Sequence, residues 1–131
     1  MTSTQPRVSV QTASGEGVSP KGPIKLLHFI SEGRSWHFFD GQAEYFRAHG
    51  FEFHAASSPG PLLEEFGRIN KVPVHPVPVD RGFAVWNDLI AVVRLFRILK
   101  EVRPHILHAH FSKPGIIGMV AGFLARTPIR I

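Results

Sequence analysis

Residues 106–125, ILHAHFSKPGIIGMVAGFLA, decide the fold class, because two kinds of segment follow one another within this stretch. Residues 106–110 are a short run typical of a β-strand, and residues 112–125 form an apolar segment of helical length. A strand that passes directly into a helix is the repeating unit of a parallel sheet with crossover helices. We therefore expect an α/β fold if similar units precede this one.

Four further strands are expected around this unit. Residues 24–30, IKLLHFI, read as a strand buried on both faces, and residues 51–56 read as the second strand. Residues 72–79 form a third strand that contains three prolines, which cannot donate to a ladder and so place it at a sheet edge. Residues 128–131 begin a fifth strand. These positions favour a Rossmann-like parallel sheet of order 3-2-1-4-5 with helices on both faces.

In the segments between the predicted strands, apolar residues recur at the spacing of a helix. Phe39, Ala43 and Phe46 recur on one face of a first helix, for which Ser35 is a candidate N-cap and Gly50 the C-terminal cap. A second helix follows the Pro59–Gly60–Pro61 breaker, and a long amphipathic helix begins at Val85 and ends before Pro104.

The chain of 131 residues, 44% hydrophobic and without cysteine, has the composition of one compact domain in a reducing compartment. Residues 1–23 are polar and rich in Ser, Thr, Gly and Pro, and we interpret them as a disordered leader. Residues 24–131 are then the Rossmann-like domain, which we expect to be incomplete at its C-terminus because the fifth strand has no following element. No segment reaches the ~18–20 apolar residues that span a bilayer. We expect a cytoplasmic protein.

Basic side chains concentrate on one predicted helix of this chain, whose net charge is +5. Arg94, Arg97, Lys100 and Arg103 recur every three residues and so form one stripe on that helix. Two interpretations stay open: a solvated helix face, or contact with an anionic membrane or an anionic lipid-linked acceptor. No nucleic-acid recognition motif accompanies the charge, so no nucleic-acid partner is expected.

In the predicted sheet order, ligands should bind where the first and fourth strands end. The loop after the first strand offers Gly33 and Ser35, whose backbone N–H groups could hold phosphate or sugar hydroxyls, although Ser35 could equally act only as a helix cap. A G-x-G-x-x-G fingerprint is absent, which argues against an NAD or FAD site.

The loop after the fourth strand offers His110, Lys113 and the helix start that includes Gly115. Alternation places His108 and His110 on the same strand face, with His110 nearer the crevice, where it could donate to a sugar or phosphate or change its charge near neutral pH. We expect His108 to be a core histidine. His105 falls on the opposite face and no zinc-ligand pattern occurs, so we expect no metal site.

Four stretches together resemble a known family: residues 35–42 (SWHFFDGQ), 51–60 (FEFHAASSPG), 72–78 (VPVHPVP) and 104–118 (PHILHAHFSKPGIIG). In this order they are similar to the N-terminal domain of family 4 glycosyltransferases of the GT-B fold, of the kind that builds bacterial polysaccharides. The resemblance implies hexosyltransferase-like transfer from a nucleotide sugar to a glycan or polyprenyl-linked acceptor at the inner face of the cell membrane. It also implies acceptor binding by this domain, a catalytic or cleft-facing role for His110, and substrate or phosphate contacts at Gly33, Ser35, Lys113 and Gly115.

The family's Glu-x7-Glu motif belongs to a C-terminal donor-binding domain that this chain does not contain. The resemblance therefore implies that this segment alone is inactive and that no cofactor other than the nucleotide-sugar substrate is required. A second hypothesis is a non-catalytic Rossmann-like module that pairs with another chain through its open sheet edge.

Overall fold

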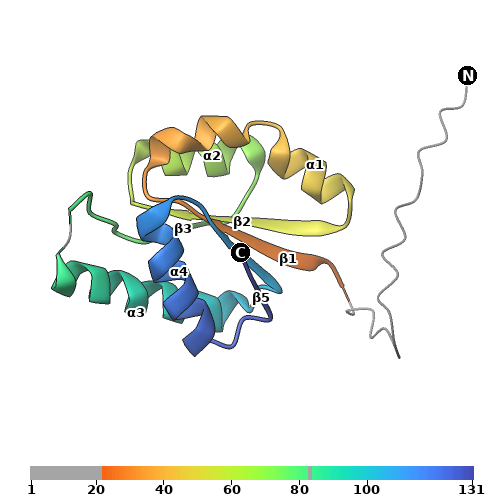
Figure 1. Ribbon diagram of the computed structural model, residues 1–131. Helices are drawn as coiled ribbons and strands as arrows, with labels where there is room; N and C mark the ends of the chain where they lie inside the picture. Colours follow the sequence, from red (N-terminus) through yellow and green to blue (C-terminus); the bar gives the residue numbers. More distant parts are fainter. Residues whose placement is uncertain (1–21, 83) are drawn as a thin grey trace, which may run out of the picture.

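The computed structural model describes residues 22–82 and 84–131, which form an α/β sandwich (Figure 1). The strands are β1 (Ile24–Phe29), β2 (Phe51–Ser57), β3 (Val74–Pro76), β4 (Ile106–Ala109) and β5 (Ile129–Arg130). The helices are α1 (Gln42–Ala48), α2 (Pro61–Asn70), α3 (Val85–Val102) and α4 (Ser112–Leu124), and a 3₁₀ helix, η1 (Gly33–Phe39), precedes α1. The predicted leader lies outside these ranges except for its last two residues.

All five strands are parallel and are ordered β3-β2-β1-β4-β5, which confirms the predicted topology. The register pairs His28 of β1 with Ala55 of β2 on one side and with His108 of β4 on the other. Because β1 and β4 are neighbours, residues from opposite ends of the sequence meet at the centre of the sheet.

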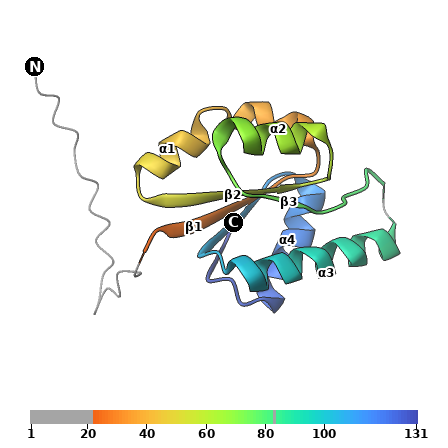
Figure 2. The same cartoon turned by 180° about the vertical axis from the view of Figure 1, so that it is seen from behind.

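Two apolar cores lie on opposite faces of the sheet, and the two views show the helices in two layers (Figures 1 and 2). One core lies beneath η1, α1 and α2 and includes Trp36, Phe53 and Phe66. The other lies beneath α3 and α4 and includes Leu95 and Leu107. Side chains alternate between the two cores along β1, which explains why its sequence is almost continuously apolar.

The third strand is shorter than predicted because of its prolines. Only residues 74–76 pair with β2, at the sheet edge where a missing N–H donor is tolerated. The edge position that the prolines predicted is therefore confirmed.

The predicted first helix is divided in two. Residues 33–39 form a 3₁₀ helix, and Gly41, at φ 82°, starts α1 separately. Ser35 lies inside the 3₁₀ helix, the N-cap is Glu32, and no side chain caps this helix, so the prediction of Ser35 as a cap was wrong. Gly50, at φ 85°, follows the end of α1, as the sequence predicted.

Helix α4 packs closely onto the sheet through its two glycines. A Cβ atom on Gly118 would lie 2.8 Å from Cβ of Ala109, and one on Gly122 would lie 3.0 Å from Cδ2 of Leu107. The spacing of small residues therefore serves helix-to-sheet contact. Among the helices of the described ranges, none is both long enough and apolar enough to cross a membrane.

Candidate functional site

The candidate site lies at the C-terminal ends of β1 and β4, where the chain leaves the sheet in opposite directions. The segment after β1 passes to η1 in one helical layer, and the segment after β4 passes to α4 in the other (Figure 1). The backbone N–H of His110 donates to the carbonyl of Phe29 over 2.9 Å, which holds the two strand ends together. Ligands of open α/β sheets bind at such a divergence.

The side chains of three histidines, His28, His108 and His110, lie close together at these strand ends. The Nδ1 atom of His28 lies 2.8 Å from Nε2 of His110, and the ring centroids of His108 and His110 are 3.9 Å apart. His28 is buried, with Phe53 against its ring at a centroid distance of 4.7 Å, and His108 and His110 are partly buried. The shared face of His108 and His110 was predicted from strand alternation, but the involvement of His28 was not.

Burial keeps this cluster uncharged at neutral pH. Burial, together with the neighbouring imidazoles, lowers the pKa of His28 to about 3. Burial and the proximity of His108 lower the pKa of His110 to about 4, and burial also lowers the pKa of His108. The idea that His110 changes its charge near neutral pH is therefore wrong. His110 can offer a neutral N–H or a lone pair, but not a cation.

The three imidazoles are close enough to suggest a metal site, since one ring nitrogen from each lies within 4.8 Å of the others. Their orientation does not suit one. Two nitrogens bound to the same tetrahedral zinc, at about 2.0–2.1 Å each, are about 3.3 Å apart, whereas the facing nitrogens of His28 and His110 are 2.8 Å apart and share a hydrogen bond. The rings would have to turn away from each other to hold a metal ion.

The start of α4 supplies backbone donors beside this cluster. Phe111, the N-cap residue, has φ 73° and ψ 165°, a conformation costly for a residue other than glycine, and no side chain caps the helix. The N–H of Gly115 donates to the carbonyl of Phe111 over 2.9 Å, so this amide is not available to a ligand. Ser112 and Lys113 occupy the first turn, where N–H groups have no partner within the helix.

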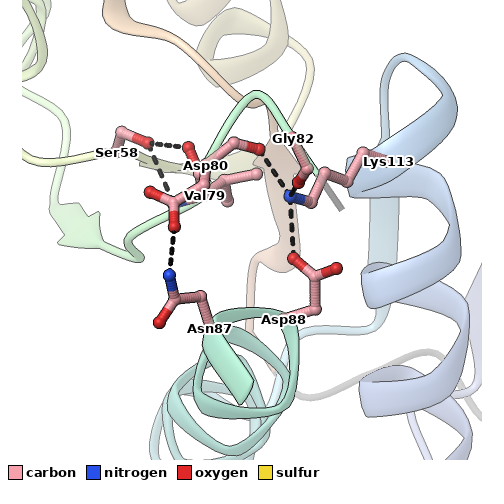
Figure 3. A network of polar contacts seen from close by, with 7 residues as sticks. All are labelled: Ser58, Val79, Asp80, Gly82, Asn87, Asp88 and Lys113. Carbon is pink, nitrogen blue, oxygen red and sulfur yellow. Dashed lines mark hydrogen bonds and ion pairs between the residues drawn. The ribbon is translucent and has the colours of Figure 1, made fainter. Parts of the chain in front are cut away.

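The ammonium of Lys113 is engaged within the protein (Figure 3). Its Nζ lies 2.7 Å from Oδ1 of Asp88 and also donates to the carbonyls of Asp80 and Gly82. These contacts join α4, α3 and the loop before α3. Because an ammonium has three donors, this geometry leaves none for the anion contact that the sequence suggested.

The hydroxyl of Ser58 and the side-chain amide of Asn87 also hold the loop before α3. Ser58 both donates to the carbonyl of Val79 and accepts from its N–H, each over 3.1 Å, and Asn87 donates to the carboxylate of Asp80 (Figure 3). The loop before α3 is thus tied to α3, to α4 and to Ser58, the residue that follows β2.

Gly33 lies where η1 approaches α2. A Cβ atom there would be 2.9 Å from Cβ of Leu62, so close packing alone requires glycine. Gly33 also lines a hollow of about 320 Å³ at the C-terminal edge of the sheet, beside Arg34 and Arg81, and the carboxylate of Glu32 in the same lining pairs with the guanidinium of Arg81. Ser35 is half-buried within η1 and does not line this hollow.

Arg94, Arg97 and Lys100 are exposed residues of α3, and Arg103, also exposed, is the C-cap residue that follows the helix. Arg94 and Arg97 border a shallow hollow of about 530 Å³ whose apolar lining includes Trp86 and Ile90. Trp86 is 77% exposed, which is unusual for so large an apolar side chain. The basic stripe therefore adjoins an exposed apolar face, which the charge pattern alone did not reveal.

Residues 35–131 match the model of the glycosyl transferase 4-like domain. The chain belongs to this family. It is 29% identical over 107 residues to the capsular polysaccharide biosynthesis glycosyltransferase CapM of Staphylococcus aureus, covering 82% of this chain and 27% of the relative. Over 48 residues it is 35% identical to an Escherichia coli UDP-Gal:alpha-D-GlcNAc-diphosphoundecaprenol alpha-1,3-galactosyltransferase, covering 37% of this chain and 12% of that enzyme. The chain thus spans about a quarter or less of these relatives.

Solved structures place this glycosyl transferase 4-like domain in the GT-B fold. A glycosyltransferase from Rickettsia africae superposes with a TM-score of 0.66 at 15% identity, covering 82% of this chain and 28% of the other. A UDP-N-acetylglucosamine 2-epimerase gives a TM-score of 0.65 at 13% identity, covering 84% and 32%. Since an epimerase shares the arrangement, the fold alone does not determine the reaction.

Within this glycosyl transferase 4-like domain, sequence reasoning missed His28 because a single histidine in an apolar strand has no distinctive pattern. The sequence does contain one indication of its position. His28 alternates with Leu26 and Ile30 on one face of the strand, and both of those side chains are buried in the same core. His105 accepts a hydrogen bond from the N–H of Lys25 at the other end of the sheet, away from the cluster, as its predicted face required.

Proposed function

We propose that this domain is the acceptor-side part of a glycosyltransferase that moves a sugar from a nucleotide-sugar donor to a lipid-linked glycan acceptor. Membership of the glycosyl transferase 4-like family supports transferase chemistry, and one relative is named for a diphosphoundecaprenol-linked substrate. The observation that carries the proposal is the position of His110, between the end of β4 and the uncapped start of α4.

In the proposed reaction the bond between the sugar's anomeric carbon and the donor diphosphate breaks, and its electron pair leaves with the diphosphate oxygen. A new bond forms between that carbon and an acceptor hydroxyl oxygen, which releases its proton. Negative charge therefore develops on the departing diphosphate. The N–H of neutral His110 and the backbone amides of Ser112 and Lys113 are suited to stabilise it, with support from the dipole of α4.

Three of the residues first considered for substrate binding take other roles in this proposal. Lys113 positions the start of α4 through Asp88 and the preceding loop instead of meeting the anion directly. Gly115 uses its N–H to close the first turn of α4 on the carbonyl of Phe111, and Gly33 brings η1 against α2. Ser35 remains a candidate only through its place on η1. No metal is assigned to the site.

The exposed face of α3 is proposed to contact the anionic surface of the inner membrane, where a lipid-linked acceptor is held. Trp86, Leu89, Ile90 and Val93 supply apolar area, and the arginines beside them supply positive charge. A helix that combines both lies in the interface and does not cross the bilayer. The location proposed for the protein is therefore peripheral, at the cytoplasmic face of the membrane.

The test is sugar transfer by the intact gene product, assayed with a panel of nucleotide sugars and undecaprenyl-diphosphate-linked acceptors. We expect transfer with one donor class, and no transfer by residues 1–131 alone, because donor binding is assigned to a C-terminal domain. Robust turnover by residues 1–131 would contradict that division of labour. Absence of transfer, with co-purification of a separate donor-binding polypeptide, would favour a non-catalytic module that pairs through the exposed edge at β5.

A further inference from the structure

We propose that His28 is a positioning residue that fixes the tautomer and orientation of His110, so that His110 presents an N–H at Nδ1 to the substrate. The inference rests on the proposed function, because it concerns the same site. The inference assigns a role in this site to His28, a residue of the first strand that precedes His110 by 82 positions and whose side chain is buried.

The two imidazoles are arranged edge to edge. Their planes are 10° apart, their centroids are 5.0 Å apart and their facing nitrogens are 2.8 Å apart. Such a short distance between nitrogens is incompatible with rings stacked face to face, so the rings lie nearly in one plane with Nδ1 of His28 directed at Nε2 of His110. This is the favourable geometry for a hydrogen bond between imidazoles.

Aromatic packing holds His28 in this orientation. Phe53 lies against one side of its ring, the edge of Phe39 approaches at a centroid distance of 5.3 Å, and Phe46 lies at 6.0 Å. Among the described residues, the titratable groups facing His28 are the imidazoles of His108 and His110. No carboxylate is among the groups that shift it, so the bond to His110 joins two neutral rings.

The unpaired nitrogen of His28 determines the direction of the hydrogen bond. Nε2 of His28 is buried and has no hydrogen-bond partner among the described residues. A neutral imidazole has one N–H and one bare nitrogen, and a buried N–H without a partner is rarer than an unpaired acceptor. The favoured tautomer therefore places the proton of His28 on Nδ1, where it is donated to Nε2 of His110.

This direction determines what His110 offers to a substrate. Because Nε2 of His110 accepts a hydrogen bond, the single proton of the neutral ring resides on Nδ1. That nitrogen has no hydrogen-bond partner within residues 22–82 and 84–131, and His110 is only partly buried. His110 thus enters the reaction as a donor of fixed orientation, which suits an oxygen that gains negative charge.

Long-range ¹H–¹⁵N correlation spectra of the intact gene product, labelled in histidine, test the tautomer directly at pH 7. We expect both His28 and His110 to be protonated at Nδ1. A His110 ring protonated at Nε2 would overturn the inference whether or not the protein transfers sugar. This measurement requires no variant and so does not depend on how a substitution folds.

A matched pair of variants tests the consequence for catalysis. In His28→Asn the side-chain amide can replace the Nδ1 donor, whereas His28→Leu has a similar shape and no donor. We expect kcat/KM to fall roughly 10- to 100-fold in His28→Leu, mainly through kcat, with substantial recovery in His28→Asn. The same pair at His105, which accepts a hydrogen bond at the opposite end of the sheet, should change kcat/KM little.

The outcomes separate the inference from the proposed function. Loss of transfer in His110→Phe together with wild-type kinetics in both His28 variants would overturn the role of His28 and leave the function intact. Wild-type transfer in His110→Phe would overturn the proposed role of His110 itself. Equal losses in His28→Leu and His28→Asn, with unchanged thermal stability, would show that the donor at position 28 is not what matters.

Discussion

Nδ1 of His28 lies 2.8 Å from Nε2 of His110, so the first strand and the end of the fourth strand are joined by a hydrogen bond between two imidazoles at the proposed reaction site. The bond links the ends of the neighbouring strands β1 and β4. At this point the segment after β1 and the segment after β4 pass to opposite helical layers. A buried aromatic core thus orients a partly buried residue at the end of the fourth strand.

The histidine cluster should make the domain less stable as the pH falls below the usual histidine pKa. The pKa of His28 is near 6.5 in the unfolded chain and about 3 in the folded protein, so only the unfolded state is protonated between these values. Its stabilising contribution is complete above pH 6.5 and is lost as the pH falls toward 3, at about 1.4 kcal/mol per pH unit for one proton. Chemical denaturation between pH 7 and pH 5 measures the slope.

His28→Leu should make the free energy of unfolding depend less steeply on pH. The variant lacks the imidazole that binds a proton in the unfolded chain but not in the folded protein. The interval from pH 7 to pH 5 is diagnostic, since most carboxylates titrate below it. A slope unchanged by the substitution would mean that other groups cause the acid sensitivity.

Gly118→Ala should destabilise the domain by about 1–3 kcal/mol, because the added methyl group would lie 2.8 Å from Cβ of Ala109. Gly115→Ala is the matched control on the same helix. A Cβ atom there meets nothing within 4 Å, so the better helix propensity of alanine should leave stability unchanged or raise it by about 0.5–1 kcal/mol. Thermal unfolding compares the two, and similar effects would contradict the close packing of α4 onto the sheet.

Lys113→Met should loosen the loop before α3 and cost about 1–3 kcal/mol, because it leaves Asp88 and two loop carbonyls without their common donor. Hydrogen exchange should increase around residues 79–82, with little change in η1. Glu32→Gln is the control, since it breaks the exposed ion pair with Arg81 and should barely alter the melting temperature. Unchanged exchange in Lys113→Met would refute the anchoring role.

Replacing both Arg94 and Arg97 by alanine should weaken binding to vesicles containing anionic lipid by roughly tenfold or more, with a smaller dependence on salt. Trp86→Ala should weaken binding at every salt concentration because it removes apolar area. The double variant Arg47→Ala/Arg68→Ala changes the net charge equally on the opposite layer and serves as the control. Equal losses in the two double variants would indicate nonspecific charge attraction.

Much of the fold could be predicted because it depends on local patterns. The three prolines of residues 72–79 limit that segment to a sheet edge, and strand alternation places His108 and His110 on one face. The 3₁₀ helix was not predictable from periodicity, since Trp36 and Phe39 also fit an α-helical spacing until Gly41 interrupts it.

The site was less predictable because its contacts join distant segments. His28 meets His110 only through the register of β1 against β4, and a lone histidine in an apolar strand gives no sign of that register. The engagement of Lys113 depends on the relative placement of α3 and α4, which brings Asp88 within 2.7 Å. Motif spacing identified residues near the ends of β1 and β4, but it did not show how their side chains pair with one another.

The most direct test of the proposed site is the kcat/KM for sugar transfer by the intact gene product carrying His110→Leu, measured beside His105→Leu. Loss of one donor to developing charge predicts a fall of roughly 100- to 1,000-fold for His110→Leu, and near wild-type transfer for His105→Leu. A His110→Leu protein that retains kcat/KM within about threefold of wild type would contradict the assignment of the reaction to this edge of the sheet.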